Sequence, residues 1–152
     1  MPKKNRQRFC YDYPRPAVTA DVVIVTKDRR RRVLLIRRKH APFAGLWALP
    51  GGFVNEDEGL ETAARRELRE ETGLDTGRIE QLAAFGDPGR DPRGHTVTIA
   101  FLAQVDAAQL RPVAADDAAD VAWFPLSDLP PLAFDHDQIL ALARRRLRQK
   151  RI

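Results

Sequence analysis

One stretch of the chain, Gly59–Thr72, predicts a helix whose charges are wrong for an ordinary surface helix. Asp57 and Glu58 precede it and Gly73 follows it, which suits the positive N-terminus and the left-handed C-terminal cap of a helix. At about 100° per residue, three glutamates fall on the same face as the apolar residues, and arginines occupy the opposite face. The three glutamates are Glu67, Glu70 and Glu71.

Three carboxylates at the inner edge of one helix repel one another, and burial raises that cost. Arg66 precedes Glu70 by four residues and can pair with it, but one guanidinium does not balance three negative charges. A hard divalent cation does, because Mg²⁺ binds a few carboxylates and leaves positions for water and substrate phosphates. The alternative is a solvent-exposed acidic patch. We therefore expect a magnesium site beside this helix.

The remaining pattern predicts strands on both sides of the helix, within a single domain that spans residues 1–152. Apolar and β-branched runs predict strands at 17–26, 33–37, 79–85, 96–105 and 121–124. The first two form a hairpin with its tip at 28–32, residues 40–50 are irregular, and residues 137–147 form a closing helix. Strands and helices mix without strict alternation, so the expected fold class is α+β, a layered αβα sandwich with a mixed β-sheet.

Basic residues concentrate in two tails, residues 1–8 and 144–152. Ten positive charges fall there, so the rest of the chain carries a net charge of −5 although the whole chain carries +5. A solvated surface is the simplest interpretation of the tails, and nucleic acid is not an expected partner. The single cysteine, Cys10, excludes a disulfide framework. No apolar run approaches the ~20 residues of a membrane helix, and the expected location is the cytoplasm.

The residues around the acidic helix also form a motif with fixed spacing. Gly52 is followed by five residues and Glu58, and then by seven residues and the run Arg66–Leu74, which reads Arg-Glu-Leu-Arg-Glu-Glu-Thr-Gly-Leu. Every fixed position matches the Nudix box, so the chain resembles a Nudix hydrolase over residues 16–140. The resemblance implies a Nudix-type αβα sandwich in which a strand–loop–helix unit presents the box. It also implies metal-dependent hydrolysis of a nucleoside diphosphate linked to another moiety.

The same resemblance assigns roles to individual residues. The implied metal ligands are Glu67, Glu70, Glu71 and the backbone carbonyl of Gly51. Glu58 and Arg66 are implied supporting residues, with Arg66 steering the carboxylates. Gly51 and Gly52 permit close approach of the backbone, and a role as turn formers is the alternative. The expected ion is Mg²⁺, with Mn²⁺ as the alternative.

The general base has two candidate positions. Some family members use a glutamate inside the box, which here is Glu67 with Glu70 beside it. Others use an acid from a later loop, which here is residues 114–120 with Asp116 and Asp117. The residues alone leave both alternatives open.

Features outside the box favour ADP-ribose as the substrate. Residues 85–97 resemble the corresponding segment of small bacterial and archaeal ADP-ribose pyrophosphatases. Arg90 and Arg93 are candidate planar donors to a diphosphate, and Phe134 and His136 are candidates to line the nucleoside site. The expected reaction converts ADP-ribose to AMP and ribose 5-phosphate.

Two other functions are compatible with the sequence. One is a nucleoside triphosphate pyrophosphatase that removes dNTPs or oxidised dGTP. The other is a non-catalytic module that binds nucleotide or RNA, against which the intact box argues. Enzymes of this kind are commonly dimers, so a homodimer is a further expectation from the resemblance.

Overall fold

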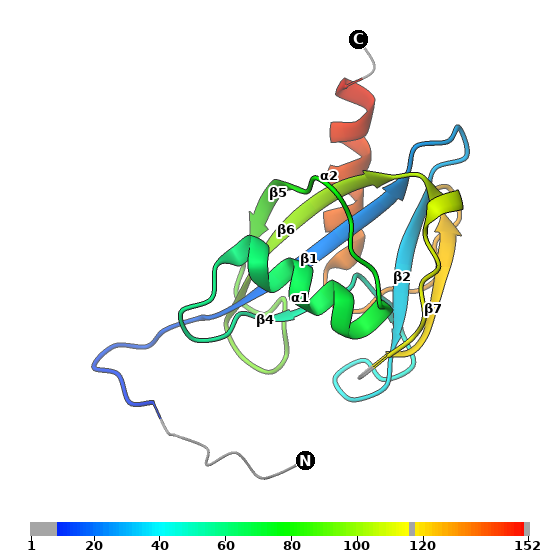
Figure 1. Cartoon of the computed structure of the whole chain (residues 1–152). Helices are drawn as coiled ribbons and strands as arrows, with labels where there is room; N and C mark the ends of the chain where they lie inside the picture. Colours follow the sequence, from blue (N-terminus) through cyan, green and yellow to red (C-terminus); the bar gives the residue numbers. More distant parts are fainter. Residues whose placement is uncertain (1–8, 116–117, 151–152) are drawn as a thin grey trace.

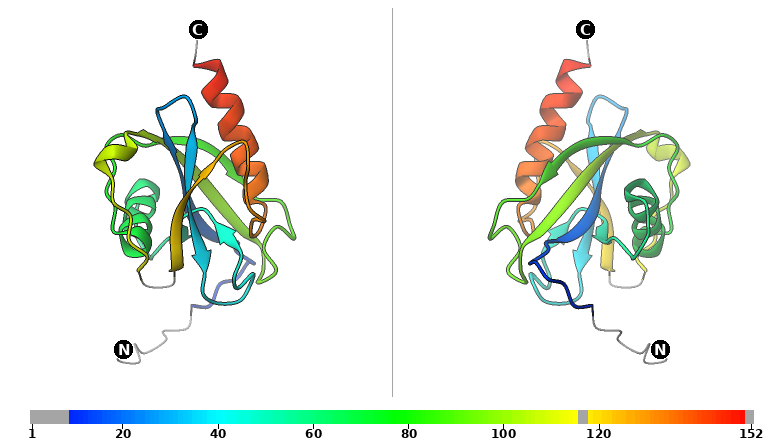
Figure 2. Two further views of the ribbon diagram at one scale, coloured as in Figure 1. Left: turned by 90° about the vertical axis from the view of Figure 1, so that its right-hand side faces the viewer. Right: turned by 90° about the vertical axis from the view of Figure 1, so that its left-hand side faces the viewer.

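The computed structural model describes residues 9–115 and 118–150 and places a mixed sheet between two helices. Its elements are β1 Ala17–Thr26, β2 Arg32–Arg38, β3 Trp47–Ala48, β4 Gly51–Phe53, α1 Leu60–Thr72, β5 Glu80–Phe85, β6 Thr96–Val105, a short 3-10 helix Ala107–Gln109, β7 Ala118–Pro125 and α2 His136–Gln149. Helix α1 covers one face of the sheet and α2 the other (Figures 1 and 2). The predicted α+β sandwich is confirmed.

Strand β1 is the centre of this sheet. It pairs in parallel with β6 along its whole length and antiparallel with both β2 and β4. Strand β7 pairs with β2, and β5 pairs with β6. Because helices cover both faces, β1 is a nearly continuous apolar run instead of an alternating one. The predicted hairpin of β1 with β2 is confirmed by the pairing of Val25 with Val33.

Alternate residues of β1 feed two hydrophobic layers. Val23 and Val25 pack into the cluster that includes the buried face of α2, whereas Val22 and Ile24 pack into the cluster that includes α1. This division follows from the two-residue period of a strand. The core of each layer therefore fixes one helix against the sheet, and both helices contribute side chains to the cavity described below.

The ends of both helices can be compared with the ends predicted from the local sequence. Gly73 ends α1 with φ 71°, and its N–H donates to the carbonyl of Arg69 at 2.9 Å, as expected for a glycine cap. The predicted closing helix over 137–147 is present as α2, which extends to Gln149, and Leu147 is buried as its helical spacing predicts. In residues 9–115 and 118–150, no helix is long and apolar enough to cross a membrane.

The expectation that residues 40–50 are wholly irregular is wrong at their end. Trp47–Ala48 forms β3 on the edge of β2, and Gly51–Phe53 forms β4 beside β1. Strands of two or three residues are too short to show a period of two, so their existence depends on the partner strand. Strand β4 is the segment that brings the glycine pair against α1.

Candidate active site

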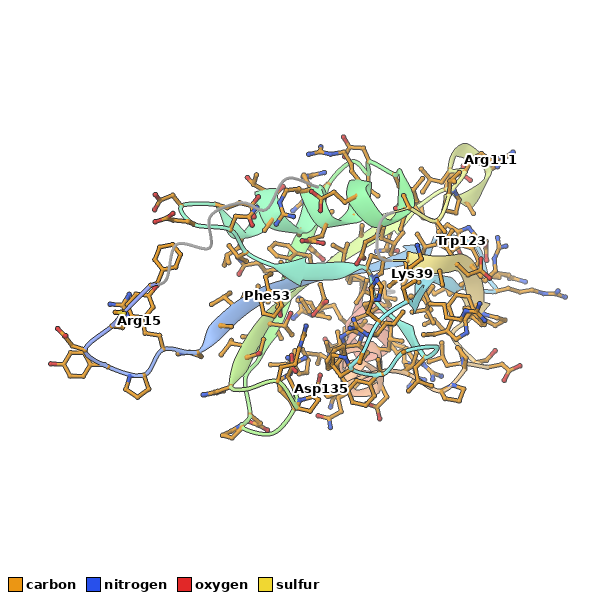
Figure 3. All side chains as sticks on the ribbon, turned by 90° about the horizontal axis from the view of Figure 1, so that it is seen from below. Arg15, Lys39, Phe53, Arg111, Trp123 and Asp135 are labelled. Atoms are coloured by element: carbon orange, nitrogen blue, oxygen red, sulfur yellow. The ribbon has the colours of Figure 1, made fainter. Side chains whose placement is uncertain are left out.

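A cavity of about 370 Å³ opens where β1 begins and β2 ends. A volume of this size is typical of small-molecule sites. Its walls come from β1, β2, β4, α1, the loop after β5 and the start of α2. Figure 3 views this end of the molecule, and among its labelled residues Phe53 and Lys39 belong to the lining.

Glu71 is the most deeply buried acid of the box, with 9% of the residue exposed. Its Oε2 accepts a hydrogen bond of 3.0 Å from the backbone N–H of Gly51. Burial is the main reason that the pKa of Glu71 is raised to about 8, and the nearby carboxylates of Glu67 and Asp21 contribute to that rise. This part of the cavity is therefore short of positive charge, and a cation bound there would be stabilised.

Arg66 organises the acids nearer the surface. Its Nε donates to Glu58 at 2.7 Å, and its Nη1 donates to Glu67 at 2.7 Å and to Glu70 at 3.1 Å. These contacts lower the pKa of Glu58 to about 2. Burial nevertheless raises the pKa of Glu67, because Arg66 offsets it only in part. Arg66 thus holds Glu67 in place and leaves its charge incompletely balanced.

The expectation that all three glutamates face inward holds for two of them. Glu67 and Glu71 line the cavity, but the Glu70 side chain is 45% exposed. Glu70 lies at the margin of the apolar face, where it pairs with Arg66 at the surface. Glu70 therefore lies at the edge of the cavity and not in its lining.

Gly51 and Gly52 allow β4 to lie against its neighbours. A Cβ on Gly52 would be 2.5 Å from the carboxyl carbon of Glu67, and one on Gly51 would be 2.1 Å from Oδ1 of Asp21. Neither glycine has a positive φ. Close approach, and not a tight turn, is therefore the reason for glycine at both positions.

His136 holds the segment that leads into β4. Its Nδ1 accepts a hydrogen bond of 3.0 Å from the N–H of Leu49, and its Nε2 lies 3.9 Å from Oδ2 of Asp21. Burial lowers the pKa of His136, which keeps the imidazole neutral. The residue lines the cavity but is only 4% exposed, so its main contacts are with protein groups, and a place in a nucleoside site stays a prediction.

Arg90 differs most from its expected role. Its guanidinium forms two hydrogen bonds to the carboxylate of Asp135, at 2.6 and 2.9 Å, and the side chain is 5% exposed. It lines the cavity, but its donors toward Asp135 are already used. Arg90 therefore ties the loop after β5 to the start of α2, and a role as a planar donor to a diphosphate stays a prediction.

Arg93 and Phe134 form the wall opposite α1. Arg93 pairs with the buried carboxylate of Asp91 at 2.8 Å. Its Cζ lies 4.8 Å from the ring centre of Phe53 and 5.5 Å from that of Phe134. A charged, planar group and two aromatic rings thus meet in one wall.

Sequence reasoning missed several residues that shape the cavity. Asp21 is an acid inside the apolar run of β1, and that mismatch was an available signal. Phe53 directly follows the glycine pair, but nothing in the sequence indicated that it would be 44% exposed beside Arg93. The pairing of Asp135 with Arg90 joins residues 45 positions apart, for which a single sequence carries no local signal.

The donor set suits a magnesium ion that keeps much of its hydration. In the part of the chain that the structure describes, no three His, Cys, Asp or Glu side chains are arranged to hold a metal. Mg²⁺ needs only one or two carboxylates together with water and substrate phosphates. Glu67 and Glu71 fit that requirement, because they lie next to the backbone of Gly51 and have too little positive charge around them. Asp116 and Asp117, the loop candidates for the base, lie outside the described residues.

Comparison with known proteins assigns this architecture to a family. An ADP-ribose pyrophosphatase of Methanocaldococcus jannaschii is 44% identical over 128 residues, which cover 84% of this chain and 73% of the relative. An ADPR-responsive transcriptional repressor of Acinetobacter baylyi is 37% identical over 143 residues. That match covers 91% of this chain but 57% of the repressor, so the chain spans little more than half of that relative's length.

A solved structure is similar over nearly the whole domain. The NUDIX domain of Shewanella oneidensis NrtR, complexed with ADP ribose, superposes with a TM-score of 0.82 and 40% identity. The superposition covers 89% of this chain and 90% of that one. Residues 15–143 also match the model of the NUDIX domain. The chain therefore belongs to the Nudix family, as the motif that begins at Gly52 predicts.

Proposed function

We propose that the protein hydrolyses ADP-ribose to AMP and ribose 5-phosphate with Mg²⁺ as its cofactor. The observation that carries this proposal is the two-sided lining of the cavity. Glu67 and Glu71 face it from α1, whereas Arg93, Phe53 and Phe134 form the opposite wall. A nucleoside diphosphate joined to a sugar needs both walls, because its phosphates require a cation and its base or ribose packs on planar groups. The similar proteins with ADP-ribose in their names add support.

The metal would be held by Glu67, Glu71 and the carbonyl of Gly51. When bound, it supplies neutralisation of the phosphate oxygens and a more acidic water. The protein's part is to fix the ligands. The N–H of Gly51 orients the carboxylate of Glu71, and Arg66 orients that of Glu67. His136 fixes the position of Leu49 and hence of the backbone that carries Gly51.

The opposite wall would position the nucleoside part of the substrate. The Arg93 guanidinium lies over the Phe53 ring and is held by Asp91, so little side-chain entropy is lost when a planar base packs there. The ion pair of Arg90 with Asp135 keeps the whole loop against α2. The distance between this wall and the carboxylates therefore depends on that ion pair.

The acceptor of the water proton is proposed to be either Glu67 or an acid of residues 114–120. Glu67→Gln and Asp117→Asn, with Asp116→Asn as a third variant, distinguish the two. Removal of the base lowers kcat and abolishes the acid limb of the pH–rate profile at every Mg²⁺ concentration. Removal of a metal ligand instead shifts the Mg²⁺ concentration that gives half-maximal rate.

The proposed substrate is tested by turnover against a panel at saturating Mg²⁺. The panel contains ADP-ribose, the dNTPs, oxidised dGTP, diadenosine tetraphosphate and NADH, and product formation is followed by chromatography. We expect kcat/KM for ADP-ribose to exceed the values for the other substrates by about tenfold or more. A wrong substrate that leaves one polar group of the site without a hydrogen-bond partner is already disfavoured by at least that factor. A triphosphate in first place would refute the substrate and favour a nucleotide-pool enzyme.

A second candidate is a domain that binds ADP-ribose without hydrolysing it. The similarity to the ADPR-responsive repressor is the specific observation in its favour. Calorimetry and product analysis on the same sample separate the two functions. Binding of ADP-ribose without formation of AMP in the presence of Mg²⁺ would establish the regulator, and AMP formation the enzyme.

A further inference from the structure

A second hollow, of about 1000 Å³, lies at the other end of β1, between the β1–β2 hairpin and the last turns of α2. The hairpin tip and the C-terminal half of α2 project together from that end of the molecule (Figures 1 and 2). Seven residues of extended chain separate Asp21 in the catalytic cavity from Asp28 at this hollow, or about 20 Å. Six arginines line it, and we call it the arginine groove: Arg29, Arg30, Arg31, Arg32, Arg144 and Arg148.

Most charges of the arginine groove have no acidic partner among the residues that the structure describes. Asp28 is the one acid in its described lining, and it pairs with Arg32 at 3.4 Å. None of the other five arginines forms an ion pair with any residue that the structure describes. The Nε of Arg31 is moreover buried without a hydrogen-bond partner among those residues. Converging like charges and an unsatisfied buried donor indicate a site for an anion.

The basic residues of helix α2 face two different surroundings. On the side facing β5, Arg146 donates to the carbonyl of Leu82 at 3.4 Å, and Lys150 pairs with Glu80. Arg144 and Arg148 lie one turn apart and face the arginine groove instead. Arg146 and Lys150 thus contact β5, whereas Arg144 and Arg148 line the arginine groove.

We propose that the arginine groove binds the phosphodiester backbone of a nucleic acid without sequence selectivity. Guanidinium groups are planar donors that match phosphate oxygens. The uncharged lining residues are Pro125, Leu126 and Ser127, which offer no aromatic ring for base stacking, so recognition is through phosphates. The hollow is concave and its charges lie on two walls, which suits an extended chain better than a flat lipid surface.

This inference revises the expectation that nucleic acid is not a partner. In the sequence, the arginines stand in two separate segments, 29–32 and 144–148, and the second segment resembles a solvated tail. The fold brings both segments to one hollow. The site is remote from the catalytic cavity, and the inference does not depend on the hydrolytic function proposed above.

The test compares two double variants of the full chain. Arg144→Gln/Arg148→Gln removes two charges from the arginine groove, and Arg145→Gln/Arg78→Gln removes two exposed charges outside it. Fluorescence anisotropy measures their affinity for a labelled single strand of about 20 nucleotides, in two unrelated sequences, from about 50 to 250 mM salt. We expect the groove variant to lower the slope of log K against log salt by about 1.4, or about 25-fold weaker binding at 0.1 M salt. The control variant keeps the wild-type slope.

Turnover of ADP-ribose and the thermal unfolding temperature are measured in parallel and should not change. Arg29→Gln/Arg30→Gln, on the exposed hairpin, probes the opposite wall if the helix variant does not fold. Equal affinity and slope in the groove and control variants would overturn the proposal. So would binding of inorganic polyphosphate by wild-type protein that shows no binding of the oligonucleotides. Because residues 1–8 are identical in all variants, their charges do not affect the comparison.

Discussion

Replacement of Glu71 by Gln should stabilise the metal-free protein while it abolishes turnover. The Glu71 carboxyl has a pKa of about 8 in the folded chain, against an ordinary value of 4.5, chiefly because it is buried. Between these two values the folded state keeps a proton that the unfolded state releases. The stability contributed by this group is therefore complete below about pH 4.5 and is lost as the pH rises through 8.

The size of the effect follows from the same shift. A displacement from 4.5 to about 8 corresponds to a loss of the order of 5 kcal/mol in the free energy of unfolding. Glutamine cannot ionise, and its amide oxygen can still accept the hydrogen bond from Gly51. We therefore expect Glu71→Gln to match the wild type near pH 5 and to be several kcal/mol more stable near pH 9 when metal is absent.

Guanidinium unfolding at about pH 5 and about pH 9, with a chelator and then with saturating Mg²⁺, measures this difference. Mg²⁺ should stabilise the wild type at high pH and leave the variant unchanged, because the variant lacks one charged ligand. Turnover should fall by about 100-fold or more. If the free energy of unfolding falls equally in the two proteins between these pH values, ionisation of buried Glu71 is not the cause of the loss. If the variant keeps its turnover, the metal assignment is wrong.

Three further substitutions test how the site is held together. Gly52→Ala places a Cβ 2.5 Å from the carboxyl carbon of Glu67, and we expect kcat to fall by about 100-fold while the unfolding temperature stays nearly constant. Arg66→Lys keeps the charge but replaces the planar guanidinium, which reaches Glu58 through Nε and Glu67 through Nη1, by a single ammonium, so the Mg²⁺ concentration for half-maximal rate should rise. Asp135→Asn leaves the buried guanidinium of Arg90 without its anion. It should cost about 3 kcal/mol in urea unfolding and raise KM for ADP-ribose more than it lowers kcat.

The elements that the sequence predicted well are those governed by local rules. The predicted strands at 17–26 and 96–105 coincide with β1 and β6, because polar and turn-forming residues flank long apolar runs. Helix α1 was predicted to within one residue, because apolar spacing and the cap at Gly73 act over a single turn. The inward direction of Glu67 and Glu71 followed from the same helical period.

The parts that the sequence did not predict depend on contacts between distant segments. The pairing of Arg90 with Asp135 forms only when α2 meets the loop after β5. Strand β4 forms only because the missing Cβ atoms let the backbone lie against β1 and α1. In each case the deciding quantity is a distance across the fold, which no local pattern contains.

The position of the Gly51 backbone shows why both helices matter to the site. Its own N–H is bound by Glu71 from α1, and two residues earlier the N–H of Leu49 is bound by His136 from α2. The two helices lie on opposite faces of the sheet (Figure 2). A three-residue segment is thus fixed from both sides at once, and a displacement of either helix moves the carbonyl that is expected to hold the metal. The geometry of the site is therefore a property of the whole sandwich, because each helix is positioned by its own hydrophobic layer.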